Sequence, residues 1–133
     1  MVLVKSSFWT GDRFHAAGNS GGKRVYGILT DGQGIRGKTV IENYIKATEL
    51  NYYNSSAYHG LGFAYVQLGR LEDALAAYTK FVELSPKNPE ACRNRGNVYG
   101  YKGDFISAGA DFRKACSLGS RESCNYLQDP RFR

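Results

Sequence analysis

The chain repeats itself after 34 residues, and this repeat restricts its possible folds more than any other feature of the sequence. Residues 55–88 can be written above residues 89–122 without a gap. A repeat of roughly this length indicates stacked supersecondary units, none of which can bury its apolar side alone. Residues of one size class then coincide: Gly62 with Gly96, Tyr65 with Tyr99, Gly69 with Gly103, Ala74 with Ala108, and Tyr78 with Phe112.

Each unit is predicted to be a pair of helices, which in the first unit cover about residues 57–68 and 71–84. Gly69 and Gly103 stand where a helix must stop and reverse, because glycine adopts the left-handed backbone conformation at low cost. Pro89 suits the first turn of the helix that follows. We expect the buried core to contain Leu61, Tyr65, Leu68, Leu71, Ala74, Tyr78, Tyr99, Phe105, Ala108 and Phe112.

These residues resemble the tetratricopeptide repeat, a family of helix pairs with a period of 34 residues. In the second unit Cys92, Arg95 and Ser120 replace the usual aromatic residue, leucine and proline. The resemblance implies an all-α fold, in which antiparallel helix pairs stack as a right-handed superhelix. It is carried by Tyr58, Leu61, Gly62, Tyr65, Ala74, Tyr78 and Pro86.

The chain is predicted to hold one repeat domain, residues 38–128, behind a glycine-rich segment, residues 1–37. Eight of the sixteen glycines lie in that segment, and each opposes helix formation by about 1 kcal/mol. Two full repeats leave an apolar helix face at the end of the stack, so we predict a homodimer unless residues 1–37 cover it. The repeat domain divides into a half repeat at 39–54, full repeats at 55–88 and 89–122, and a closing helix at 123–128.

Charge and hydropathy narrow the class of protein. The formal net charge is +6, which suits an acidic partner without indicating nucleic acid. A nucleic-acid site built on Arg93, Arg95, Tyr99 and Tyr101 is disfavoured, because the two tyrosines lie on different helix faces. No apolar run is long enough to span a membrane, and residues 1–8 lack the features of a secretory signal. We therefore expect a cytoplasmic protein.

One motif suggests a different function. Gly32, Gly37, Lys38 and Thr39 match the phosphate-binding loop pattern, in which backbone N–H groups surround phosphate oxygens. Such a loop needs a parallel sheet around it, and the residues after Thr39 indicate helices instead. Nucleotide binding is therefore the alternative, and a flexible loop that enters a helix is favoured.

No catalytic or metal-binding pattern is present elsewhere. His15 and His59 lie far apart in the sequence, and neither is paired with a nucleophile or has the spacing of a metal ligand. We therefore expect no enzyme activity, no cofactor and no metal.

The three cysteines are Cys92, Cys116 and Cys124. Secreted relatives of this repeat class join adjacent helices with a disulfide, and that resemblance implies a Cys116–Cys124 bridge as one alternative. The other alternative is two partly buried thiols, which the expected cytoplasmic location favours. Cys92 is expected in the core.

The resemblance also implies a function. In this family the first helices of successive repeats line a concave groove that holds peptides, so we predict a non-catalytic protein–protein interaction module. Arg93 and Asn97 resemble half of the clamp with which chaperone-binding members hold a C-terminal carboxylate, whereas Cys124 and Gln128 depart from its other half. The predicted groove residues are His59, Phe63, Val66, Gln67, Arg93, Asn94, Asn97 and Tyr101.

Two ligand types follow from these residues. Arg93, Asn94 and Asn97 favour an acidic segment or a C-terminal carboxylate, because a guanidinium and amides can all donate to one carboxylate. Phe63 and Val66 favour an apolar ligand instead. A solvated polar face without a ligand is the remaining interpretation.

Overall fold

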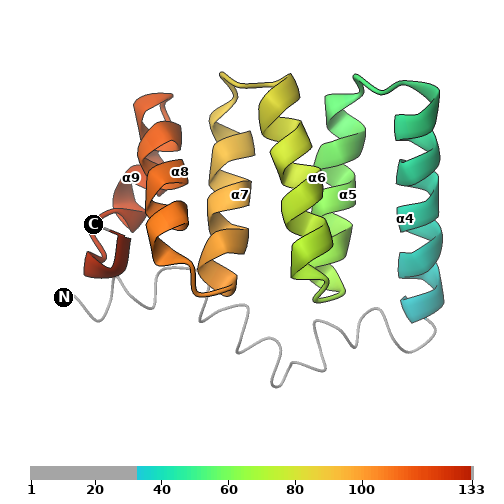
Figure 1. Ribbon diagram of the computed structural model, residues 1–133, viewed down its shortest axis with the longest axis horizontal. Coiled ribbons are helices and arrows are strands. Elements are labelled where there is room, and N and C mark those ends of the chain that lie inside the picture. Colours follow the sequence, from blue (N-terminus) through green and yellow to red (C-terminus); the bar gives the residue numbers. More distant parts are fainter. Residues whose placement is uncertain (1–32, 133) are drawn as a thin grey trace.

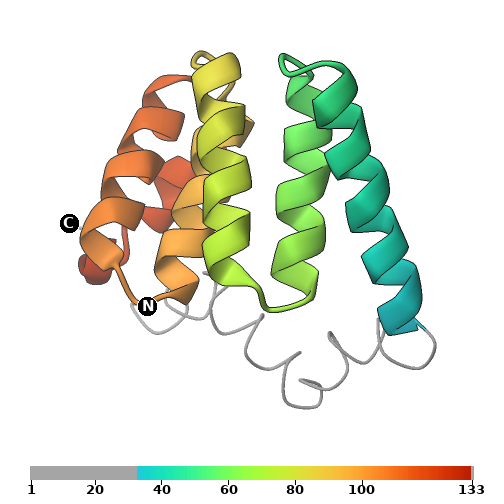
Figure 2. The same cartoon turned by 45° about the vertical axis from the view of Figure 1, so that its right-hand side comes forward.

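The computed structural model describes residues 33–132, which fold into helices without a strand. Figure 1 shows the helices side by side, from α4 at one end of the molecule to α8 and α9 at the other, and Figure 2 shows the same order from a second direction. The predicted all-α stack is confirmed. Its elements are α4 (Gln33–Leu50), α5 (Ser55–Gln67), α6 (Leu71–Leu84), α7 (Pro89–Tyr101), α8 (Phe105–Ser117), α9 (Arg121–Tyr126) and the 3₁₀ turn η1 (Pro130–Phe132).

Glycines in the left-handed conformation end three of the helices. Gly69 has a φ of 76° and follows α5, and Gly103 has a φ of 85° and follows α7. Both are turn glycines that the repeat predicts. Gly119, with a φ of 110°, turns the chain from α8 into α9. Helices α5, α7, α8 and α9 each begin with a side-chain cap, formed by Asn54, Asn88, Asp104 and Ser120 respectively.

Two equivalent glycines let the helices of each repeat approach closely. A Cβ atom on Gly62 would lie 2.5 Å from Cε1 of Tyr78, and one on Gly96 would lie 2.8 Å from Cε1 of Phe112. Neither distance is tolerable between carbon atoms that do not bond. The ring of the second helix therefore occupies the space that the glycine of the first leaves open.

Six of the ten residues predicted for the core are buried, and the other four are partly buried. Four of the ten expected residues are only partly buried, at the ends of helices, where they pack against the core: Leu68, Leu71, Tyr99 and Phe105. The other six are buried: Leu61, Tyr65, Ala74, Tyr78, Ala108 and Phe112.

Helix α4 begins earlier than the repeat predicts. Its counterpart α6 starts at Leu71, which corresponds to residue 37, yet α4 starts at Gln33. Residues 33–37 are therefore helical, although their glycine content predicted a loop. Ile41 is buried in the core and Tyr44 packs against it. Once such packing has formed the later turns of a helix, each added residue gains a hydrogen bond without a new nucleation step.

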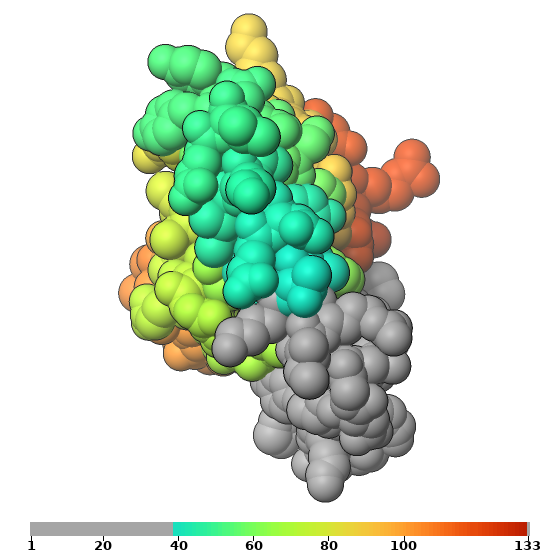
Figure 3. Space-filling view, turned by 90° about the vertical axis from the view of Figure 1, so that its right-hand side faces the viewer, coloured from blue at the N-terminus to red at the C-terminus, as the bar shows by residue number. Residues whose placement is uncertain are grey.

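The two ends of the stack differ. At the C-terminal end Tyr126 and Phe132 are buried against Phe112, and the backbone carbonyl of Phe132 lies where Gly109 has no side chain. At the other end, which faces the viewer in Figure 3, no other described element lies over the outer side of α4. Large apolar side chains are exposed on α4 and the loop after it: Val40, Leu50, Tyr52 and Tyr53.

Candidate functional site

A pocket of about 500 Å³ opens where α4, α5 and α7 come together over α6. Phe63 is 57% exposed on one of its walls. Asn94 and Ser56 supply neutral polar groups to the same surface. Three of the predicted groove residues are among its lining residues, which are Tyr44, Ser56, His59, Gly60, Phe63, Tyr78, Glu90 and Asn94.

His59 has a fixed position in the pocket. Its imidazole stacks on the ring of Phe81, with 4.9 Å between the centroids and 15° between the planes. Its Nε2 atom lies 3.6 Å from Oε2 of Glu90 on α7. His59 therefore links two helices across the pocket.

Arg93 is already paired with carboxylates of its own chain. Its Nη2 atom lies 3.7 Å from Oε2 of Glu90, and its Nη1 atom lies 3.2 Å from Oε1 of Glu122. Glu122 belongs to α9, and it also accepts a hydrogen bond of 2.6 Å from the Tyr126 hydroxyl. The groove cation on which the predicted carboxylate site depends thus has an internal carboxylate beside it.

The other predicted groove residues divide into three groups. Asn94 lines the pocket, and the Oδ1 atom of Asn97 is buried without a hydrogen-bond partner among the residues described. Gln67 and Tyr101 are partly buried at the ends of α5 and α7, and Tyr101 packs against the core. Val66 is buried in the core, so its prediction as a groove residue is wrong. It lies on the side of α5 that packs inward, three residues after the exposed Phe63.

Sequence reasoning missed several parts of the site. Tyr44 and Tyr78 are equivalent positions of successive repeats and both line the pocket. The 34-residue offset shows that the two tyrosines are equivalent, but it does not predict that both rings line the same pocket. Gly60 makes room for the Tyr44 ring, because a Cβ atom there would lie 2.3 Å from Cζ of Tyr44. Glu122 on Arg93 had no signal in the sequence, since it depends on where α9 docks.

The phenol of Tyr78 is a titratable group that lines the pocket. Loss of water raises the pKa of this phenol well above its ordinary value, and the nearby Tyr101 and Glu90 act in the same direction. The ionisable side chains beside the pocket follow one another in a row of close contacts, from His59 to Glu90, from Glu90 to Arg93 and from Arg93 to Glu122.

The phosphate-loop motif lies in a helix. Gly37, Lys38 and Thr39 fall within α4, and Gly32 lies outside the described residues. From Gly37 onward the backbone N–H groups of α4 are bonded to carbonyls four residues earlier, so those of Gly37, Lys38 and Thr39 cannot surround a phosphate. Residues 33–132 also contain no strand that could support such a loop. The nucleotide-binding alternative thus lacks the sheet that it needs in this part of the chain.

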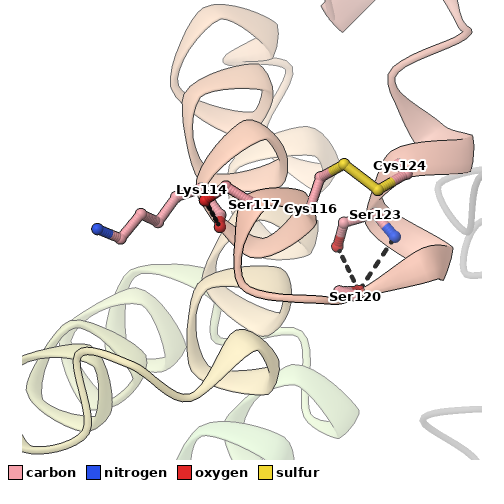
Figure 4. The surroundings of a disulfide bond; sticks show 6 residues. All are labelled: Lys114, Cys116, Ser117, Ser120, Ser123 and Cys124. Atoms are coloured by element: carbon pink, nitrogen blue, oxygen red, sulfur yellow. Dashed lines mark hydrogen bonds between the residues drawn. A yellow bond between two sulfur atoms is a disulfide. The ribbon is translucent and has the colours of Figure 1, made fainter.

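Cys116 and Cys124 form a disulfide that joins α8 to α9, as Figure 4 shows. The expectation of two reduced thiols is wrong for this structure. The turn at Gly119 and Ser120 brings the two Cα atoms to 4.8 Å, within the range that a disulfide spans. Cys92 is a free, buried core residue as predicted, and burial raises the pKa of its thiol.

Arg95 forms an ion pair within its own repeat, so its side chain is not available to a surface site. Its Nε and Nη2 atoms donate to the two carboxylate oxygens of Asp111 at 2.8 and 2.9 Å. Its guanidinium also lies 5.9 Å from the ring centroid of Tyr99. The nucleic-acid site that the sequence disfavoured thus loses two of its four residues to internal packing.

Residues 33–132 hold no group of three or more His, Cys, Asp or Glu side chains that could bind a metal ion. Within the same range no helix combines the length and the apolar character needed to cross a membrane.

Two family profiles match the chain. One, described as a TPR repeat, covers residues 64–103, and the other, described as a tetratricopeptide repeat, covers residues 89–118. Residues 64–118 belong to the tetratricopeptide repeat family. The two full repeats described above fall largely within these matches, and repeats of this family are protein–protein interaction modules. No curated protein gives a significant match.

Several solved structures share this fold. The tetratricopeptide repeat domain of Arabidopsis OM64 has a TM-score of 0.65 at 23% identity, over 92% of this chain and 93% of that one. The second such domain of human RPAP3, in complex with the HSP70 peptide SGPTIEEVD, has a TM-score of 0.65 at 19% identity, over 89% and 95%. The Yersinia enterocolitica type III secretion translocator chaperone SycD has a TM-score of 0.61 at 17% identity, over 83% and 77%. At these identities the likeness concerns the fold.

Proposed function

We propose that this tetratricopeptide repeat protein binds a peptide segment of another protein in the groove between α5 and α7, without catalysis. The observation that carries the proposal is the pocket of about 500 Å³, whose wall keeps Phe63 exposed. A large apolar side chain that stays in water beside polar groups is typical of a binding surface. The human RPAP3 domain of the same fold was solved with a peptide, which supports a peptide as the ligand class.

The ligand is proposed to be an acidic segment or a C-terminal carboxylate, held by Arg93 and the amides of Asn94 and Asn97. The Oδ1 atom of Asn97 is buried, so the amide N–H₂ group of this side chain is the part that would donate a hydrogen bond to the ligand. An acidic ligand has to compete with Glu122 for Arg93. The alternative ligand is an apolar side chain in the Phe63 pocket, with Tyr44 and Tyr78 in place of the buried Val66.

Titration of a labelled acidic peptide against the full chain tests this proposal. The nonapeptide SGPTIEEVD serves as the probe, and the same peptide with a C-terminal amide shows whether the carboxylate is read. Arg93→Ala should weaken binding about ten- to a hundredfold if the carboxylate dominates, and Arg93→Lys should restore part of it. Phe63→Ala should have the larger effect if the apolar pocket dominates.

A matched control separates groove effects from general ones. Ile106 is 85% exposed on α8 and does not line the pocket, so Ile106→Ala removes a comparable apolar surface elsewhere. We expect this variant to bind like the wild type. Equal affinity of wild type, Arg93→Ala and Phe63→Ala for every peptide tested would rule out the groove as the site.

Location and oligomeric state remain proposals. We keep the cytoplasm as the proposed location. The Cys116–Cys124 disulfide argues against it, because such bonds persist mainly in oxidising compartments.

A homodimer through the outer side of α4 is proposed from the exposed Leu50 and Tyr53. Light scattering at high micromolar concentration should show a dimer that Leu50→Glu dissociates, and a monomer for both chains would exclude it.

A further inference from the structure

Helix α9 contacts two different parts of the molecule with its two sides. Cys124 is bonded to Cys116 of α8, while Glu122 pairs with Arg93 of α7. Residues two apart on a helix point in nearly opposite directions, since each residue turns the helix by about 100°. The disulfide therefore holds one side of α9 on α8, as Figure 4 shows, while the other side presents a carboxylate to the groove.

The two ends of α9 are held by different bonds. Its last turn carries Tyr126, which is 2% exposed and lies 4.9 Å from the ring of Phe112, centroid to centroid. Its first turn carries Glu122 and is attached through the Ser120 cap and the disulfide. Without the disulfide the last turn keeps its aromatic contact, and the first turn keeps its cap, the buried Ser123 and the bonds of Glu122 to Arg93 and Tyr126. The disulfide is the covalent attachment of this helix to α8, so its loss weakens the hold on the part of α9 that carries Glu122.

Glu122 occupies the position that an acidic ligand needs. Its Oε1 atom lies 3.2 Å from Nη1 of Arg93, and the hydroxyl of Tyr126 fixes its other oxygen at 2.6 Å. A peptide carboxylate that approaches Arg93 has to replace this one. An ion pair of this exposure contributes at most about 1 kcal/mol, so the competition corresponds to an affinity change of about two- to fivefold.

We propose that the Cys116–Cys124 disulfide regulates access to Arg93, and this inference rests on the function proposed above. In the oxidised chain α9 holds Glu122 on Arg93 and weakens the binding of acidic peptides. A dithiol reductant breaks the S–S bond by supplying two electrons and two protons, so that each sulfur becomes a thiol and the dithiol becomes a disulfide. The first turn of α9 then moves, and Arg93 becomes available to the peptide.

The test compares SGPTIEEVD binding to the oxidised and the dithiothreitol-reduced full chain, both with Cys92→Ala to remove the third thiol. The reduced chain should bind about two- to fivefold more tightly. Glu122→Gln should give the oxidised chain the same gain and abolish the effect of reduction. A chain with Cys116→Ser and Cys124→Ser should bind like the reduced form whether or not reductant is present.

A second measurement needs no ligand. The side-chain Nε–H signal of Arg93 in an NMR spectrum should shift on reduction, and Glu122→Gln should shift it in the same direction in the oxidised chain. Peptide binding that is equal in both redox states, or weaker after reduction, would overturn the regulation while leaving the groove intact. If reduction leaves the Arg93 signal unchanged, the regulation is overturned whether or not a peptide binds. If no peptide binds in either redox state, that result counts against the proposed function.

Discussion

The two full repeats use different chemistry at one pair of equivalent positions. In residues 55–88, Leu61 and Ala77 line an apolar pocket of about 220 Å³ between α5 and α6. In residues 89–122 the same positions hold Arg95 and Asp111, which form an ion pair with two hydrogen bonds. Both helix pairs nevertheless have the same lengths within one residue and the same turn glycine. The shared backbone therefore depends on something other than the polarity of this pair.

The common element is the contact of a small residue with a ring. Gly62 meets Tyr78 in one repeat, and Gly96 meets Phe112 in the other. These contacts lie between the helices of each pair and set how closely the helices approach. The Leu61 and Arg95 positions lie beside this contact, where an apolar group and a hydrogen-bonded charge are both acceptable. Substitutions at the two kinds of position should consequently differ in size.

The largest effect is expected from Arg95→Ala. The side chain of Asp111 is only 8% exposed, and without its partner a buried carboxylate stays uncompensated, which costs about 3–5 kcal/mol. Asp111→Ala should cost less, because the Arg95 side chain is 22% exposed and its guanidinium can reach water. Denaturant unfolding of both variants measures this order. An equal or greater loss for Asp111→Ala would show that the guanidinium is the more deeply buried partner.

The glycine contacts come next. A methyl group on Gly62 or Gly96 would force the facing ring to move, which costs about 1–3 kcal/mol and is offset in part by the better helix propensity of alanine. Gly62→Ala should be the more destabilising, since its Cβ atom would come closer to the ring. Ala110→Gly, at an exposed position of α8, calibrates the propensity term. A stability gain in Gly62→Ala would show that the ring contact does not set the helix spacing.

A smaller difference between the repeats depends on pH. Tyr78 has a hydroxyl where Phe112 has none, and burial raises the pKa of Tyr78. The folded chain therefore holds this proton more tightly than the unfolded chain, whose tyrosines ionise near pH 10. Stability should be unaffected below pH 10 and should fall above it, by up to about 1.4 kcal/mol per pH unit. Tyr78→Phe should reduce this fall in alkaline unfolding curves, and identical curves would show that Tyr78 ionises normally.

Most of the fold follows from the sequence because the 34-residue offset repeats the packing contacts themselves. Gly69 and Gly103 indicated the turns, and the repeated positions of Gly62 and Tyr78 fall on the contact between the helices. The start of α4 could not be predicted, because local glycine content opposes the helix, whereas packing further along it, at Ile41 and Tyr44, stabilises it. Local propensity lost to tertiary packing at this position.

The candidate site was less predictable than the fold. His59, Phe63 and Asn94 line one pocket, since their helices and the faces that carry them are fixed by the repeat. Val66 was misplaced because it lies near the boundary between the exposed and the buried side of α5. Glu122 could not be found at all, because its contact with Arg93 depends on the way in which α9 docks on α8.

The smallest effect is expected where the second repeat is given the chemistry of the first. Arg95→Leu combined with Asp111→Ala reproduces the Leu61 and Ala77 pair, so that neither charge is left without its partner. Replacement of a buried ion pair by apolar residues is often neutral or stabilising, and the first repeat shows that this backbone accepts leucine and alanine. We expect the double variant to unfold within about 1 kcal/mol of the wild type, although Arg95→Ala alone is strongly destabilising. The double-mutant cycle then separates the cost of an unpaired charge from the net value of the pair. A loss above about 2 kcal/mol in the double variant would show that the second repeat needs its ion pair. The contacts of α7 with the groove or with α9 would then require a charged pair that α5 does not require.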